Sequence, residues 1–122
     1  MNNKDFSILL EKRTMKFAIN IVKVSSAMPN SCESQVIRKQ LTKSGTSIGA
    51  NYHEANRSRS RADFKNRINI CLSESNETVY WLKIIKALSL SKQNSLQPIL
   101  LEANELLALF TSISTKLKQK QL

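Results

Sequence analysis

The sequence predicts an all-α protein, an up-down-up-down antiparallel four-helix bundle in which residues 1–122 form a single domain. A chain of 122 residues has the length of one domain. Two glycines and two prolines leave few positions for tight turns, while 41% of the residues are hydrophobic. Four long segments repeat apolar residues every three or four positions and are joined by short polar links, which is the pattern of a helical bundle.

The first helix is expected over Phe6 to Met28, because Pro29 cannot continue it. Its predicted buried residues are Phe6, Leu10, Phe17, Ile21, Val24 and Met28. Ser31 is expected to cap the second helix, since a serine hydroxyl accepts a hydrogen bond from the first turn. The predicted buried face of that helix is Ile37, Leu41, Ser44, Ile48, Tyr52 and Ala55.

The third helix is expected to begin at Ser60, because Asp63 three residues later completes an arrangement that resembles a capping box. Its predicted buried face is Phe64, Ile68, Cys71, Ser75, Val79, Leu82 and Ile85. Ser95 is expected to cap the fourth helix, with Pro98 in the first turn. The predicted buried face there is Ile99, Ala103, Leu106, Phe110, Ile113 and Leu117.

Two of the predicted helices carry a second apolar stripe. In the first helix this stripe contains Leu9 with Ile8 and Val22, and in the fourth it contains Leu100 with Leu107. An isolated bundle needs one apolar seam per helix, so the surplus fits either a subunit interface or a wider core stripe. The pattern does not separate these two interpretations.

Both glycines of the chain, Gly45 and Gly49, lie four residues apart in the second helix. Each costs about 1 kcal/mol relative to alanine in a helix interior, so the pair predicts a stripe where another backbone comes close, at a helix contact or an oligomer interface. They belong to a longer motif in the middle third of the chain. The motif comprises Ser44 to Asn51 (SGTSIGAN), Glu54-Ala55, Asp63-Phe64, Glu74, Glu77-Thr78 and Tyr80-Trp81-Leu82.

This motif resembles the bacterial four-helix-bundle family encoded in intervening sequences of 23S rRNA genes, whose members are often labelled ribosomal proteins. The resemblance implies a four-helix bundle and a homopentameric ring. It implies no particular reaction. A similar accessory protein of diversity-generating retroelements binds nucleic acid and a reverse transcriptase, so the resemblance also allows RNA, DNA or a protein as a partner.

The chain is strongly basic, with 19 Lys and Arg against nine Asp and Glu and a net charge of +10. Such an excess favours polyanionic partners and salt-sensitive binding. No apolar run is long enough to cross a bilayer, and the first residues lack the apolar core of a signal peptide. The sequence therefore predicts a soluble, cytoplasmic protein with no membrane role.

The up-down-up-down topology brings the turn between helices two and three to the same end as both chain termini. The cations expected to gather there are Lys4, Arg57, Arg59, Arg61, Lys65, Lys116, Lys118 and Lys120, the predicted nucleic-acid-binding residues. Asp5, Glu54 and Asp63 are the acidic residues expected to oppose them. Arginine suits phosphate oxygens, although single cations at helix ends also complement the helix dipole.

No catalytic residue is predicted, because the chain has one histidine, His53, and lacks a phosphate loop or a nucleophile motif. Glu54 and Glu74 are expected too far apart to share a metal, so no metal and no cofactor are predicted. Cys32 and Cys71 are expected as free thiols, about 20 Å apart along the helix axes.

Four residues late in the third helix are assigned to helix packing or to an oligomer interface, together with the two glycines. They are Glu74, Glu77, Tyr80 and Trp81, with Lys39 and Lys43 as possible partners of the carboxylates. Stacking of the two aromatic rings on nucleic-acid bases is the less favoured alternative.

These observations predict a non-enzymatic, oligomeric accessory protein that binds RNA or DNA through its basic end. The alternative is an interaction scaffold whose positive charge engages an acidic partner protein, with no direct nucleic-acid role.

Overall fold

The computed structural model describes residues 2–120, which form four α-helices and no strand. The helices are α1 (Asn3–Ser26), α2 (Cys32–Ala55), α3 (Arg61–Ala87) and α4 (Gln93–Gln119). Each helix packs against the next along the chain, and α1 also touches α4 through the smallest of the four helix contacts. The predicted all-α four-helix fold is confirmed.

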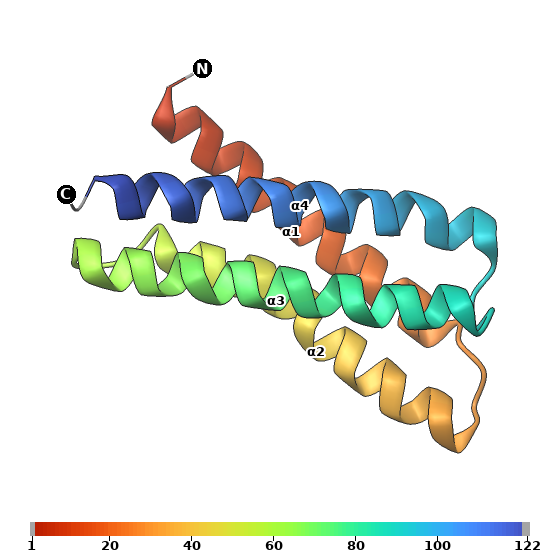
Figure 1. Ribbon diagram of the computed structural model, residues 1–122. Coiled ribbons are helices and arrows are strands. Elements are labelled where there is room, and N and C mark those ends of the chain that lie inside the picture. The colour runs from red at the N-terminus through yellow and green to blue at the C-terminus, as the bar shows by residue number, and fades with distance from the viewer. Residues whose placement is uncertain (1, 121–122) are drawn as a thin grey trace.

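Consecutive helices run in opposite directions, as the ribbon in Figure 1 shows. The start of α1, the α2–α3 connection and the end of α4 therefore lie at one end of the bundle, on the left of the view. The α1–α2 hairpin crosses the α3–α4 hairpin obliquely. As a result, the first turns of α1 stand away from α4, and the first turns of α2 stand away from α3.

Serine caps begin two of the helices, as predicted. The Ser31 hydroxyl accepts a hydrogen bond from the Ser34 N–H at 3.2 Å, and the Ser60 hydroxyl accepts one from the Asp63 N–H at 3.0 Å. In α1 the start expected at Phe6 comes earlier, because the Asn2 side chain accepts from the Asp5 N–H at 2.8 Å and caps the helix.

The predicted start of the fourth helix is wrong. The cap of α4 is Lys92, without a side-chain hydrogen bond, and Ser95 already donates its N–H to the Lys92 carbonyl at 3.1 Å inside the first turn. Pro98 consequently lies beyond the first turn and within the helix, where its missing N–H removes one intrahelical hydrogen bond. A cap at Ser95 would accept from the N–H groups two and three residues later, but Gln97 lies beyond the four unpaired N–H groups of α4 and Pro98 has no N–H.

The core lies between the four helices, and most of its residues are those that the sequence predicts to be buried. Every predicted residue of α2 is buried, and α3 differs only in that Phe64 is partly buried. In α4, Ala103, Leu106 and Phe110 are buried. Ile99, Ile113 and Leu117 pack partly buried against the core.

Phe6 is the clear exception, because it is 38% exposed rather than buried. Its turn of α1 lies where that helix leans away from the rest of the bundle (Figure 1). Spacing places Phe6 on the same face of the helix as Leu10, but no neighbouring helix covers that face at its first turn.

The two surplus apolar stripes have different fates. In α4, Leu100 is buried and Leu107 packs partly buried against the core, so this stripe widens the core. In α1, Ile8, Leu9 and Val22 are exposed. Two further large apolar residues of that helix, Met15 and Ile19, are exposed as well, at 63% and 48%. The surface of α1 thus carries apolar side chains that this chain does not cover.

The glycine pair faces α1 of the same chain. A Cβ atom added at Gly45 would lie 2.7 Å from Cγ2 of Ile21, and one added at Gly49 would lie 3.1 Å from Cβ of Thr14 and 3.2 Å from its carbonyl carbon. Because side chains do not fit at such distances, the two glycines allow α1 and α2 to pack closely.

Hydroxyl groups tie neighbouring helices together inside the bundle. The interhelical pairs are Ser25 with Thr42 at 2.8 Å, Ser44 with Thr78 at 3.0 Å and Ser114 with Asn69 at 2.9 Å. These pairs link α1 to α2, α2 to α3 and α3 to α4. Within residues 2–120, no helix combines the length and apolar character needed to cross a bilayer.

Candidate nucleic-acid interface

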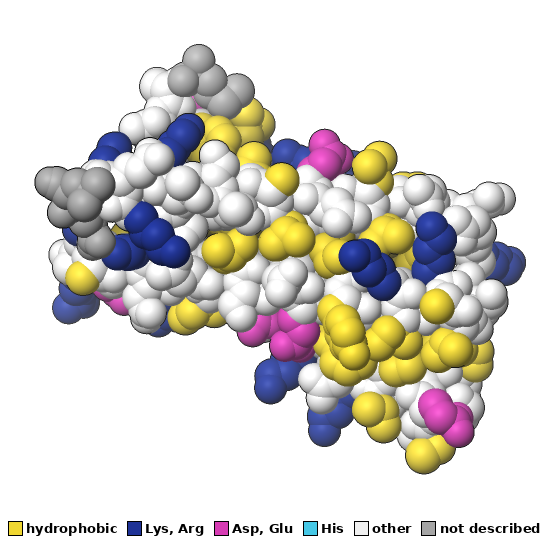
Figure 2. Space-filling model, in the orientation of Figure 1, with side chains coloured by type: hydrophobic (Ala, Val, Ile, Leu, Met, Phe, Trp, Pro, Cys, Tyr) yellow, Lys and Arg dark blue, Asp and Glu magenta, His cyan; other side chains and the backbone are white. Residues whose placement is uncertain are grey.

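The end of the bundle that holds the α2–α3 connection and the outer ends of α1 and α4 carries all eight predicted cations, and we call it the basic end. Seven of these side chains are exposed: Lys4, Arg57, Arg59, Arg61, Lys116, Lys118 and Lys120. Lys65 is partly buried on α3. Figure 2 shows Lys and Arg side chains gathered at this end, over the end of α4 and the start of α1. Topology thus brings together residues that are far apart in the sequence.

Arg59 and Arg61 lie at the start of α3, where they flank its serine cap. Arg59 is in the connection before the helix, and Arg61 is the first helical residue. The first turn of a helix presents unpaired N–H groups and the positive end of the helix dipole, which attract anions. Asp63 is the one acidic residue of that turn. Here, backbone and side chains both contribute positive potential.

Lys116 and Lys118 lie in the last turn of α4, and Lys120 is its C-cap. Their charges face the negative end of the α4 dipole, which they partly neutralise. These lysines therefore contribute less positive potential than an equal number at a helix N-terminus.

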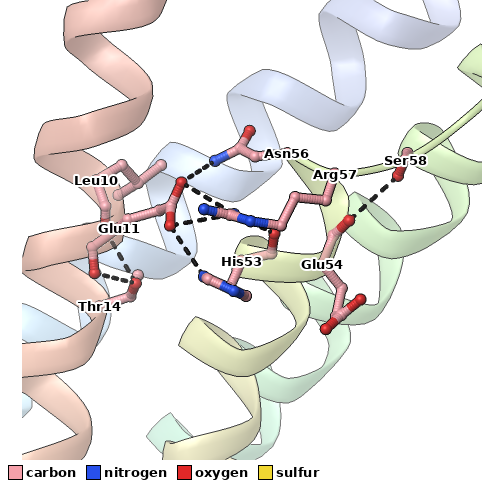
Figure 3. Close-up of polar contacts among 8 residues, drawn as sticks. All are labelled: Leu10, Glu11, Thr14, His53, Glu54, Asn56, Arg57 and Ser58. Carbon is pink, nitrogen blue, oxygen red and sulfur yellow. Dashed lines mark hydrogen bonds and ion pairs between the residues drawn. The ribbon is translucent and has the colours of Figure 1, made fainter.

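Arg57 is held by a carboxylate that the sequence analysis did not place at this end. Its Nη1 lies 3.3 Å and 3.5 Å from the two carboxylate oxygens of Glu11 on α1, and it also donates to the His53 carbonyl at 2.8 Å. Asn56 donates its Nδ2–H to Glu11 at 2.9 Å. Figure 3 shows these side chains converging on Glu11. Glu11 must therefore be added to the acidic residues that oppose the basic end.

The contact with His53 defines which nitrogen of the ring carries a proton. Nδ1 of His53 lies 3.0 Å from Oε1 of Glu11. Burial alone would raise the pKa of Glu11, but hydrogen bonds from Asn56, His53 and Arg57, with the charge of Arg57, outweigh it and lower the pKa. The carboxylate is therefore ionised at neutral pH and can only accept, so Nδ1 is the donor.

Glu54 lies on the same turn as His53 but has a different role. Its backbone carbonyl accepts a hydrogen bond from the Ser58 hydroxyl at 3.4 Å. Its carboxylate is exposed and points away from the Glu11 cluster (Figure 3). Within the described residues this carboxylate has no ion pair, so Glu54 only adds a negative charge near the basic end.

A groove between α1 and α2 borders the Glu11 cluster. It has a volume of about 650 Å³. Small side chains form much of its lining, among them Ala18, Gly49 and Ala50, and Glu11 and His53 line it as well. Sequence reasoning missed this groove, although a glycine followed by an alanine opposite an exposed Met15 was a signal that side chains would leave space there.

The four residues assigned to packing or an oligomer interface lie far from the basic end, on the second half of α3. Trp81 is partly buried against the core and donates its Nε1–H to Glu77 at 3.2 Å. The ring of Tyr80 is 59% exposed and meets Trp81 edge to face, with the centroids 5.1 Å apart. In Figure 2, apolar side chains gather where the second half of α3 faces the first turns of α2.

The pKa of Glu74, on the same stretch of α3, is subject to opposing effects. Burial and the neighbouring charge of Glu77 raise the pKa of Glu74, and the charge of Lys43 acts in the opposite direction. Within the described residues, neither Lys39 nor Lys43 forms an ion pair with these carboxylates. Lys43 therefore acts on Glu74 through its charge across the α2–α3 contact.

Within the described residues, neither the two cysteines nor a group of metal-binding side chains provides a further site. Cys32 is exposed and Cys71 buried, and both are free thiols. Burial raises the pKa of Cys71 to about 12, so its reactive thiolate form is scarce at neutral pH. Among residues 2–120, no three His, Cys, Asp or Glu side chains lie close enough together to hold a metal ion.

Comparison with known proteins identifies the family. The family model described as 23S rRNA-intervening sequence protein matches residues 8–112. A crystal structure from Bacteroides thetaiotaomicron, described as a protein with unknown function from the S23 ribosomal protein family, is 36% identical and has a TM-score of 0.80. The similarity covers 89% of this chain and 97% of that one. Among curated proteins, none matches. The chain belongs to the 23S rRNA-intervening sequence protein family.

Proposed function

We propose that this protein is a non-enzymatic, oligomeric accessory protein that binds RNA or DNA through its basic end in the cytoplasm. The observation that carries the proposal is the convergence of eight cations from three parts of the chain at one end of the bundle.

The arginines at the start of α3 are the strongest part of this surface. Arg59 and Arg61 are exposed, and Arg61 stands where the helix dipole adds positive potential. Arginine side chains and helix N-termini are both common ligands of nucleic-acid phosphates. We therefore expect phosphate contacts to centre on this turn and the lysines of α4 to strengthen them at longer range.

Contacts of this type read the backbone of a nucleic acid rather than its bases. The described basic end has no exposed aromatic side chain except Phe6 on α1, so stacking on bases adds little there. Binding is therefore expected to tolerate many sequences and to weaken steeply as salt rises, because each neutralised phosphate releases counterions.

Assembly would multiply the basic end. The exposed apolar side chains of α1, including Met15, Ile19 and Val22, give a surface that a second copy can cover. Resemblance to the family suggests a pentameric ring. In a closed ring with parallel subunits, every copy presents its basic end on the same face, so a modest cluster becomes a ring of positive charge.

The binding test compares charge reversal at the two ends of the bundle. The variant Arg59→Glu with Arg61→Glu should abolish binding of a structured RNA at low salt, and it should still fold because a glutamate in the first turn suits the helix dipole. The control Lys39→Glu with Lys92→Glu makes the same change of charge at the opposite end and should bind far more tightly than the first variant. Filter binding over a salt series provides the measurement.

Two outcomes would redirect the proposal. If the Arg59 and Arg61 reversal binds RNA and DNA as tightly as the parent, the basic end is not the binding surface. If the parent binds neither nucleic acid at low salt, an acidic partner protein becomes the better explanation of the charge.

The assembly test introduces a charge into the apolar surface of α1. Ile19→Lys should convert the oligomer to monomers, because lysine cannot be buried unpaired at an interface. The control Lys16→Ala changes an exposed residue of the same helix. Light scattering on a sizing column reads the mass, and a stable monomer of the parent at micromolar concentration would contradict the oligomer.

A further inference from the structure

We propose that Arg57, His53 and Asn56 form a phosphate-binding site that the Glu11 carboxylate occupies in the free protein, and that a nucleic-acid phosphate displaces this carboxylate. The proposal rests on the proposed function and deepens it, since it makes Glu11 an internal competitor for one of the phosphate contacts.

The donor set is suited to an anion. Three side chains at the end of α2 each place a nitrogen toward Glu11, at 2.9 Å from Asn56, 3.0 Å from His53 and 3.3 Å from Arg57. A guanidinium and polar side chains of this kind are the usual ligands of phosphate oxygens in nucleic-acid complexes. A carboxylate and a phosphate accept hydrogen bonds from the same donors.

The contacts between the Glu11 carboxylate and the Arg57 guanidinium are long for an ion pair. Strong hydrogen bonds between charged groups are about 2.7–2.9 Å long, whereas both contacts of Nη1 with the carboxylate are longer, at 3.3 and 3.5 Å. The Arg57 side chain is also 53% exposed. A phosphate can therefore approach the guanidinium from solvent while Glu11 is still in place.

The structure also provides space for the displaced carboxylate. Glu11 is one of the residues that line the groove of about 650 Å³ between α1 and α2. Lys12 lines the same groove and offers a cation to the displaced carboxylate.

The proposed phosphate site lies close in the sequence to the arginines at the start of α3. Arg57 is two residues from Arg59 and four from Arg61. A nucleic acid already held by those arginines presents its next phosphate at high local concentration, so it can displace Glu11 where a single free phosphate cannot. Glu11 would thus favour polymers over small anions.

The test removes the competitor and compares it with a matched loss of charge. Glu11→Gln and Glu54→Gln each delete one negative charge near the basic end, but only the Glu11 carboxylate contacts the Arg57 guanidinium. With a labelled single-stranded RNA, Glu11→Gln should bind roughly three- to fivefold more tightly than Glu54→Gln, the range of a partly exposed ion pair. The slope of log affinity against log salt should match that of the parent, because one phosphate contacts Arg57 in both complexes.

A second comparison traces the gain to Arg57. In an Arg57→Gln background, Glu11→Gln should gain no more than Glu54→Gln does, because the released cation is absent. Inorganic phosphate at millimolar concentration should not bind the parent at this site but should bind Glu11→Gln, as followed by the His53 ring signals in NMR spectra.

The outcomes separate the two proposals. If the parent binds no nucleic acid, the proposed function fails. If the parent binds but Glu11→Gln gains no more than Glu54→Gln, or keeps its gain without Arg57, only the phosphate site fails. Should Glu11→Gln not fold, Glu11→Asp keeps the charge and withdraws the carboxylate, so unchanged RNA binding by that variant would overturn the site.

Discussion

Arg13 on α1 and Glu102 on α4 form a two-point ion pair that joins the two helices with the smallest mutual contact. Nε of Arg13 lies 2.6 Å from one carboxylate oxygen, and Nη2 lies 2.7 Å from the other. The side chains are 37% and 27% exposed, so water screens this pair only in part. The pair therefore links α1 and α4 across the smallest of the four helix contacts.

Removing this pair should loosen the α1–α4 contact. Glu102→Gln is expected to lower the free energy of unfolding by about 1 kcal/mol, the upper part of the range for partly exposed pairs of good geometry. The control is Glu105→Gln, whose carboxylate makes one contact with Arg13 at 3.7 Å and should matter less. Urea unfolding measures both, and a coupling of zero between Glu102→Gln and Arg13→Gln would contradict the prediction.

A side chain at Gly45 should disturb the α1–α2 contact. Its Cβ would lie 2.7 and 2.8 Å from the two γ-carbons of Ile21, so Gly45→Ala should cost about 1–3 kcal/mol through overpacking, despite better helix propensity. In an Ile21→Ala background the same change should cost nothing or stabilise, because the obstructing atoms are gone. An equal cost in both backgrounds, measured by thermal unfolding, would mean that the clash is not the cause.

The turn after α3 should accept glycine with a gain in stability. Ser89 has a φ of 54°, the left-handed region that side chains disfavour, and no other non-glycine residue within residues 2–120 has a positive φ. Ser89→Gly is expected to stabilise the fold by about 0.5–1 kcal/mol. Ser91→Gly is the matched control and should destabilise slightly or have no effect. A lower melting temperature for Ser89→Gly than for the parent would contradict this account.

The pH dependence of stability should reveal the raised pKa of Glu74. Its pKa is raised, so the folded chain binds this proton more readily than the unfolded chain, and stability is lost as pH rises through the folded pKa. Glu74→Gln should therefore stabilise the fold at pH 7 and give no gain well below the ordinary value of 4.5.

Glu11→Gln provides the opposite comparison. The pKa of Glu11 is lowered, so its contribution is present above the unfolded pKa and is lost as pH falls through the folded value. That variant should be less stable than the parent at pH 7, with the difference vanishing in acid. Parallel pH profiles for both variants would show that neither carboxylate titrates as the structure indicates.

Local patterns predicted most of the fold correctly. The spacing of Leu41, Ile48 and Tyr52 predicts the buried face of α2, and Ser31 and Ser60 cap the helices that follow them. These features depend on residues within about one helical turn, so they can be read along the chain. Ser95 shows the limit, because Lys92 starts α4 one turn earlier without a recognisable capping side chain.

Topology and the count of charges predicted the gathering of cations at one end, but not which of these cations contact a carboxylate. All three arginines are exposed, but Arg57 also contacts a carboxylate 46 residues earlier in the chain. Nothing near Arg57 in the sequence signals Glu11. Whether these cations bind nucleic acid stays a prediction that the measurements above can decide.

Helix periodicity, polar links and caps in the sequence determine that four antiparallel helices form and that the α2–α3 turn shares an end with both termini. Packing between helices decides the rest: Phe6 stays partly exposed, Leu100 joins the core, Ile21 fills the space above Gly45, and Glu11 reaches Arg57. A helix pattern repeats over a few residues and specifies which face is apolar. Which helix covers that face, and for how many turns, depends on the angle at which side chains of two distant segments pack.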